Sequence, residues 1–514
     1  MAQPPPAPSA AGSLARDLGL AALVLLVAAS HRMGWSDLII SIDWNRTVQA
    51  AADLVTGAPD PTAPLFLYTS MPALLLAGVL QLGTDPLLTF RLWALLGSLG
   101  APLLFLGLRP VGGRATALLA ALVLALSQAD AHSAIGLRSP YAVSTFLALA
   151  CWGLVGSARR RPWGPGLLAA GAAMAATLDP GLAPMTLAAL AVALLATSRL
   201  RGRQARGAWL LMLLPCAVVG CVAVLDGAEI LRNLRAMAGG FPPMPFMQPS
   251  PTWAVRFGLD LPGPILAVTL VWGAAGIAAV TLERLGARSP PSLESSTSSR
   301  LAIGGLLLLL AGAAPWVWAW RSHAYLWHHH LVGLQPLILA TLVSLGVPLA
   351  RSVKSHRLGA ASWSPLLVWV IWSAAVLPST ATQRAALRAI PQRSVRFADQ
   401  VAAAAADLAA GRSAQPDLTL LSPTEGFEDR CVFAQFTQDL ARVLAPSALP
   451  HSVALAPPGL AESLGMGEPA RDLPGSGLAL WSHDDHEALI RASRGFCPDA
   501  RQGRCWTCLQ RASR

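Results

Sequence analysis

Charged residues are scarce in this chain. Only 13% of its 514 residues are Asp, Glu, Lys or Arg, whereas 54% are hydrophobic, and soluble globular domains carry about 25% charged residues. Apolar runs of roughly 20 residues, the length that crosses a hydrocarbon layer, recur along most of the chain. This composition excludes a single soluble domain and predicts an α-helical polytopic membrane protein.

Lysine is almost absent. Lys354 is the only one, so the net charge of +11 comes almost wholly from arginine. The arginines stand in short clusters between apolar runs and form no continuous basic face, which argues against nucleic-acid binding. No internal repeat stands out in the sequence, and this weakens the interpretation as a transporter built from inverted repeats.

The arginine clusters predict the orientation of the spans, because cytoplasmic loops retain positive charge. Three apolar runs precede residue 109, and one of them must not cross the membrane if the cluster at 109–114 is to lie inside. The run 64–83 carries Pro64, Tyr68 and Pro72 near its start, so it is expected to lie along the membrane surface. Eleven spans result, with the amino terminus inside and the tail outside. The predicted spans are 18–33, 88–108, 115–129, 141–157, 164–178, 184–198, 207–225, 262–282, 301–319, 331–349 and 362–379.

The domain boundaries follow from changes in composition. Residues 1–15 are rich in Pro and Ala and are predicted to be disordered. No convincing small-residue cleavage site follows the first apolar run, so this run is expected to be an uncleaved helix. A transmembrane domain is predicted over 16–380, with outer loops at 34–87 and 226–258.

The tail, 394–514, is predicted to be a small soluble α/β domain on the outer face. An Ala-rich helical pattern covers 395–410, and β-like apolar runs occur at 418–421, 453–455 and 478–481. Four cysteines favour two disulfides in an oxidising space, whereas the Cys-x-x-Cys spacing leaves zinc or redox chemistry as alternatives. These cysteines are Cys431, Cys497, Cys505 and Cys508.

Four features in order resemble the GT-C superfamily of membrane glycosyltransferases, which includes protein O-mannosyltransferases and the aminoarabinose transferase of lipid A. They are Asp43 followed by a helix that ends at Gly57, a Pro-started surface helix at 64–83 followed by Asp85-Pro86, a Gly113-Arg114 turn, and Leu137-Arg138-Ser139-Pro140-Tyr141 at the start of a helix. The match covers residues 15–200 well and the later spans in outline.

The resemblance implies a function. Relatives transfer a sugar from a polyprenyl-phosphate donor to a lipid, glycan or protein acceptor on the outer face of the membrane. For this chain it implies an integral protein of the bacterial inner membrane, with the site and the tail on the periplasmic face and with membrane lipid among its partners. No cofactor is assigned, and a divalent metal is left open.

Asp43 is the predicted catalytic base, because inverting transfer needs a carboxylate to accept the proton of the acceptor. Its alternative is a helix N-cap. By resemblance, four arginines are predicted to bind the donor phosphate, with interfacial snorkelling or a surface position as alternatives. These are Arg138, Arg232, Arg235 and Arg321. Asp37 is expected to be a solvated loop residue.

A second acidic residue is missing where many relatives carry one, since Gly136-Leu137 precede Arg138. Asp130 and His132 lie a turn or two earlier and are the predicted catalytic substitutes. Otherwise the activity rests on Asp43 alone. The departure also leaves open a catalytically degenerate homologue that acts as an envelope scaffold, and a lipid or glycan carrier is a separate alternative. Three consecutive histidines at 328–330 cannot all face one ion from a helix, so no metal ligand is assigned.

Overall fold

The structure is a computed structural model that is mostly helical and carries one small sheet. Contacts between residues divide the chain into two compact units. The helical unit comprises Met1–Gly34, Trp93–Ala134 and Ser139–Thr380, and the α/β unit comprises Trp35–Leu92, Ile135–Arg138 and Ala381–Arg514. The residues that the structure describes are 10–38, 45–57, 70–133, 142–179, 182–213, 217, 220, 261–285, 293–321, 332–352, 363–420, 427–447, 450–463 and 465–483.

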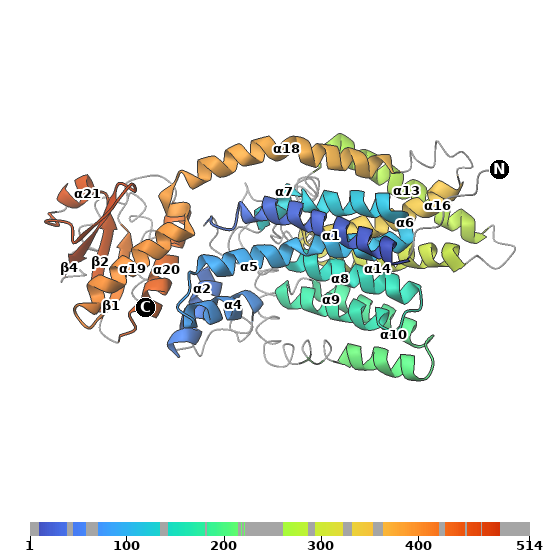
Figure 1. The fold of residues 1–514 in the computed structure, drawn as a ribbon, viewed down its shortest axis with the longest axis horizontal. Coiled ribbons are helices and arrows are strands. Elements are labelled where there is room, and N and C mark those ends of the chain that lie inside the picture. The colour runs from blue at the N-terminus through green and yellow to red at the C-terminus, as the bar shows by residue number, and fades with distance from the viewer. Residues whose placement is uncertain are drawn as a thin grey trace. The chain divides into compact units, whose positions relative to one another are not determined.

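The helical unit is built from long apolar helices, among which α8, α9 and α10 lie side by side (Figure 1). Helix α5 begins and α18 ends in the α/β unit. The helices are α1 (Ala10–Met33), α5 (Leu87–Ser98), α6 (Gly100–Ala125), α7 (Gln128–Ser133), α8 (Val143–Ala158), α9 (Gly164–Leu178), α10 (Ala183–Thr197), α13 (Gly263–Leu285), α14 (Leu293–Arg321), α16 (Gln335–Ser352) and α18 (Ser364–Arg388).

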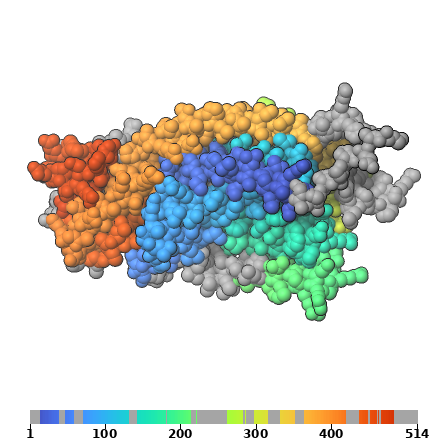
Figure 2. Space-filling model, viewed as in Figure 1, coloured from blue at the N-terminus to red at the C-terminus, as the bar shows by residue number. Residues whose placement is uncertain are grey.

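Large apolar side chains cover exposed faces of these helices. Helix α1 lies at the surface (dark blue in Figure 2) and exposes Leu18, Leu23 and Leu26 by more than half. Exposed apolar surface of this extent suits contact with lipid better than contact with water. Within the described residues, five helical stretches are long and apolar enough to cross a membrane. They are Ser13–Met33, Leu87–Ala125, Gly263–Leu282, Thr297–Ala314 and Ser364–Arg388.

Helix α6 is interrupted at Gly113, which has φ 77° and ψ 175°. A positive φ is readily reached by glycine, so this residue allows the backbone to leave the helical path. Arg109 and Arg114, on either side of the break, both pair with the buried carboxylate of Asp17 in α1, and Arg114 Nε lies 2.6 Å from Asp17 Oδ1. The break in α6 is therefore fixed to the amino-terminal part of α1.

Helices α8 and α9 approach each other closely because glycines line their contact. A Cβ atom placed on Gly153 would overlap the backbone of Leu168, and one placed on Gly171 would lie 2.6 Å from the backbone nitrogen of Ala150. Small residues allow this close approach of backbones, which stabilises helix pairs through van der Waals contact in lipid.

The α/β unit combines two short helices from the first loop with the tail. Helix α4 has 11 residues, and a helix of that length is about 16 Å long, too short to cross the hydrocarbon core. The elements are α2 (Asn45–Thr56), α4 (Met71–Gln81), η4 (Pro391–Arg393), α19 (Val395–Ala410), β1 (Gln415–Leu420), α20 (Phe427–Leu444), β2 (Pro450–Ala456), α21 (Pro458–Ser463), β3 (Arg471–Leu473) and β4 (Leu478–His483).

The sheet has the strand order β1-β2-β4-β3, with β1 and β2 parallel and the other pairs antiparallel. The outer edge of β1 is closed by one side chain of α20. Gln438 Oε1 accepts a hydrogen bond from the N–H of Leu418 at 2.6 Å, and Gln438 Nε2 donates to the carbonyl of Pro416 at 2.7 Å. The amide thus occupies the position that a neighbouring strand would take.

These observations confirm the prediction of a helical chain with several apolar helices and a small C-terminal sheet. The predicted helix at 395–410 has the bounds of α19, and the three predicted β-runs lie in or overlap β1, β2 and β4. Strand β3 was not predicted.

The count of eleven spans stays a prediction. The segments 1–9 and 484–514, with Cys497, Cys505 and Cys508, lie outside the described residues, as does the side chain of Cys431.

Candidate functional site

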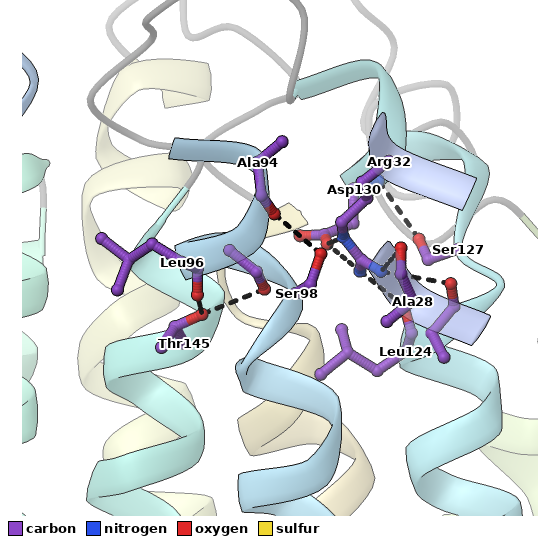
Figure 3. Close-up of polar contacts among 11 residues, drawn as sticks. Ala28, Arg32, Ala94, Leu96, Ser98, Leu124, Ser127, Asp130 and Thr145 are labelled. Atoms are coloured by element: carbon purple, nitrogen blue, oxygen red, sulfur yellow. Dashed lines mark hydrogen bonds and ion pairs between the residues drawn. The ribbon is translucent and has the colours of Figure 1, made fainter. Parts of the chain in front are cut away.

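A buried ion pair joins α1 to α7 in the helical unit (Figure 3). Arg32 is in the last turn of α1 and Asp130 is in the first turn of α7, and their side chains are 0% and 1% exposed. Arg32 Nε donates to Asp130 Oδ2 at 3.0 Å, and Nη2 donates to the same oxygen. Charges inside a membrane bundle are costly and mark positions of function.

The guanidinium of Arg32 is fully engaged by the protein. Besides the two bonds to Asp130, Nη1 donates to the carbonyls of Ala28 and Ala125, and Nη2 donates to the carbonyl of Leu124 at 2.8 Å. Arginine has five N–H donors, so these five bonds use all of them. Two of the acceptors, the carbonyls of Leu124 and Ala125, lie in the last turn of α6, where a cation also interacts favourably with the helix dipole. Arg32 therefore ties together α1, α6 and α7.

Asp130 is held from several sides. Its backbone N–H donates to Ser127 Oγ at 3.2 Å. Burial raises the pKa of the Asp130 carboxyl, while the Arg32 guanidinium and a hydrogen bond from Ser144 act in the opposite direction. The ion pair with Arg32 holds Asp130, and with it α7, against α1. Its catalytic role stays a prediction.

The start of α8 is fixed to the end of α5. Thr145 Oγ1 lies 2.8 Å from the carbonyl oxygen of Leu96 and 3.0 Å from that of Gly97 (Figure 3). A Cβ atom on Gly100 would lie 3.2 Å from the backbone of Thr145, so glycine permits this approach. The segment that carries Arg138 thus connects α7, which Arg32 holds, with α8, which Thr145 holds.

The other predicted site residues are described only in part or not at all. Asp43, Arg138, Arg232 and Arg235 lie outside the described residues. His132 belongs to α7 and Arg321 is the last residue of α14, but their side chains lie outside the described residues. Within the described part of the chain, no three His, Cys, Asp or Glu side chains are grouped so that they could hold a metal ion.

Sequence reasoning missed Arg32 and Asp17. Asp17 directly precedes the predicted span 18–33 and Arg32 lies in its last turn, where a charge is easily interpreted as the polar end of a span. The available signal was their position inside one continuous helical stretch, Ala10–Met33, which is longer than the apolar run between them. A charge within the length of a span needs a partner, and both residues have theirs on α6 or α7.

No protein-family model and no curated protein matches this chain. Among solved structures, the chain is similar to the crystal structure of ArnT from Cupriavidus metallidurans bound to undecaprenyl phosphate. The two share 13% sequence identity with a TM-score of 0.41, and the alignment covers 92% of this chain and 98% of that chain.

Proposed function

We propose that this chain is a membrane-embedded inverting glycosyltransferase that moves a sugar from a polyprenyl-phosphate donor to a lipid, glycan or protein acceptor. Asp43 is the base, and Arg138, Arg232, Arg235 and Arg321 stabilise the departing phosphate. The active site and the tail face the periplasm of a bacterium.

The buried contact between Arg32 and Asp130 carries this proposal. From Arg32 the chain runs a short way to Asp43, and from Asp130 it runs a short way to Arg138. In the sequence, the proposed base and the first proposed phosphate ligand therefore each follow one member of this ion pair closely. This supports a shared site, because transfer requires the base and the phosphate ligand to face the same reacting centre.

The chemistry is a displacement at the anomeric carbon of the sugar. Asp43 accepts the proton of the acceptor hydroxyl as the new glycosidic bond forms, and the polyprenyl phosphate leaves with the bonding electrons. The fixed guanidinium groups stabilise the negative charge that develops on the phosphate.

The test compares Asp43→Asn with Asp60→Asn, which removes the same charge from the same predicted loop. We expect Asp43→Asn to lower kcat by a factor of about 100 or more, with normal insertion and folding, and Asp60→Asn to leave it unchanged. The assay follows sugar transfer from a polyprenyl-phosphate donor in membranes, after mass spectrometry of envelope lipids and glycans in a deletion strain has identified the missing sugar. Full activity of Asp43→Asn would contradict the assignment of the base.

One observation favours a second candidate, the degenerate homologue that acts as an envelope scaffold. Asp130, the substitute for the missing second acid, is engaged by Arg32. Binding of a polyprenyl phosphate to the purified protein separates the two candidates. The transferase requires this binding, and the scaffold does not.

A further inference from the structure

The first loop and the tail are joined at the point where the loop begins. Leu38 pairs with Ser394 in an antiparallel β-bridge, and the N–H of Val395 donates to the carbonyl of Asp37 at 3.0 Å. The Asp37 carboxylate also lies 3.0 Å from Arg388 Nη2. Asp37, expected to be solvated only, is thus an anchor between the loop and the segment that precedes α19.

A second junction joins α2 to α20. Arg442 of α20 places Nη2 3.5 Å from Asp53 Oδ1 in α2 and Nη1 3.6 Å from Asp439 Oδ1. Both carboxylates are buried, at 6% and 1% exposure. With the Gln415 amide oriented to satisfy its neighbours, its oxygen accepts from Arg442 Nε at 3.0 Å. One guanidinium therefore links the first loop, α20 and β1.

A third junction is aromatic. Phe90, near the start of α5, packs edge to face against Phe436 of α20, with ring centroids 6.0 Å apart and an interplanar angle of 88°. Both side chains are buried, and such pairs contribute about 0.5–1.5 kcal/mol beyond their buried area. The tail thus contacts the loop at its start, in its middle and at its end.

We propose that the tail domain positions the first loop for catalysis, and that Arg442 is a positioning residue acting through Asp53. This inference rests on the proposed function. Asp43 lies between two anchored elements: Leu38, bridged to Ser394, and α2, which begins at Asn45 and is held by Arg442. Because a shift of about 1 Å at a reacting group can reduce the rate about 100-fold, release of α2 slows transfer.

The kinetic test uses Arg442→Gln, Asp53→Asn and the double variant. The matched control is Arg471→Gln, since Arg471 pairs with Asp407 in the same unit and both side chains are exposed. We expect kcat to fall about 10- to 100-fold in each loop variant, with KM for the donor unchanged. The double variant should lose no more than the larger single loss, because the two residues act as one pair. Arg471→Gln should keep the wild-type kcat.

If Arg442 and Asp53 served only to stabilise the fold, their substitution would lower the yield of folded protein but leave kcat of the folded fraction unchanged. This result would overturn the inference. Wild-type kcat in both Arg442→Gln and Asp53→Asn would overturn it as well. If Arg442→Gln fails to fold, Asp53→Asn alone decides, since asparagine has nearly the same shape as aspartate.

A cross-link tests the junction independently of transfer. Residues paired in an antiparallel bridge have Cα atoms about 4.5–5.5 Å apart, which suits a disulfide. Leu38→Cys combined with Ser394→Cys should form one on mild oxidation, detected as two joined fragments after cleavage at a protease site inserted at residue 288. The single-cysteine variants are the controls. Failure to cross-link overturns the junction and with it the positioning inference. Cross-linking in a protein without transferase activity leaves the junction standing and refutes the proposed function, on which the positioning role rests.

Discussion

The interiors of the two units of this chain are packed in different ways. In the helical unit, α8 and α9 meet through glycines whose backbones leave no room for a Cβ atom, and the buried carboxylates of Asp17 and Asp130 pair with arginines of neighbouring helices. In the α/β unit, buried aromatic rings fill the core, as in the stacked pair Phe397 and Phe433 with centroids 5.6 Å apart.

This difference is expected if lipid surrounds the helical unit and water surrounds the α/β unit, as predicted from the sequence. Lipid is as apolar as a leucine side chain, so helices in a membrane gain little from burying leucine and depend on close backbone contact and satisfied polar groups. Water drives large apolar side chains together, so the α/β unit is stabilised by the area it buries. The same kind of substitution should therefore have different effects in the two units.

The largest effect is expected from Gly153→Leu in α8. The new side chain has no space beside the backbone of Leu168, and α8 and α9 must separate, so we expect loss of folded protein in detergent, measured by size-exclusion chromatography. The control is Gly19→Leu in α1, where nothing lies within 4 Å of an added Cβ atom. If the two variants gave the same amount of folded protein, close backbone contact between α8 and α9 would not be what stabilises the helical unit.

Arg32→Met should rank second. It leaves the carboxylate of Asp130 buried without its cation, which costs about 3–5 kcal/mol of unfolding free energy. The double variant Arg32→Met with Asp130→Leu removes both charges and should be more stable than the single variant. Thermal unfolding in detergent measures both, and a double variant less stable than Arg32→Met would refute the explanation by an unpaired charge.

Gln438→Leu probes the α/β unit. It removes the partners of the Leu418 N–H and the Pro416 carbonyl, and we expect a loss of about 1–3 kcal/mol in denaturant unfolding. Gln400 of α19 is exposed, so Gln400→Leu should change the unfolding free energy little. If both substitutions gave the same small change, the side chain of Gln438 would not be a substitute for a strand.

The smallest effect is expected at Asp399. Burial and the nearby charge of Asp85 raise the pKa of this carboxyl. A raised pKa means that the folded state binds the proton more tightly, so stability is lost as pH rises from the unfolded pKa, about 3.9, through the folded value. Asp399→Asn should raise Tm at pH 7 and have no such effect below about pH 4. Water around the exposed Asp85 screens the repulsion, so the gain is under about 1 kcal/mol.

The control for this substitution is Asp407→Asn, because Asp407 is exposed and pairs with Arg471. It should not raise Tm at pH 7. A pH-independent gain in Asp399→Asn would mean that its charge is not the cause.

Secondary structure could be predicted from the sequence where it depends on neighbouring residues alone. The bounds of α19 followed from an Ala-rich run, and the structure adds Ser394 Oγ as the acceptor of the Phe397 N–H, 3.4 Å away, at its N-cap. Strand β3 escaped because it has three residues, of which two are exposed, and no apolar alternation.

Long-range contacts could not be predicted from one sequence. Asp53 and Arg442 are separated by 389 residues, and nothing in either neighbourhood indicates the other. The grouping of the first loop with the tail depends on such pairs, so the predicted domains, 16–380 and 394–514, gave no sign of it. The resemblance supplied Asp43 and Arg138 as site residues, but not the Arg32 contact from which their segments depart.

The two charges of α1 have a consequence for biosynthesis. Arg32 and Asp130 are 98 residues apart, and Asp17 and Arg114 are 97 apart. At a synthesis rate of about 5–20 residues per second, roughly 5–20 s pass before the partners emerge from the ribosome. During that interval α1 has neither partner, so the insertion machinery or the lipid headgroups must shelter an acid near one end and a base at the other until α6 and α7 arrive.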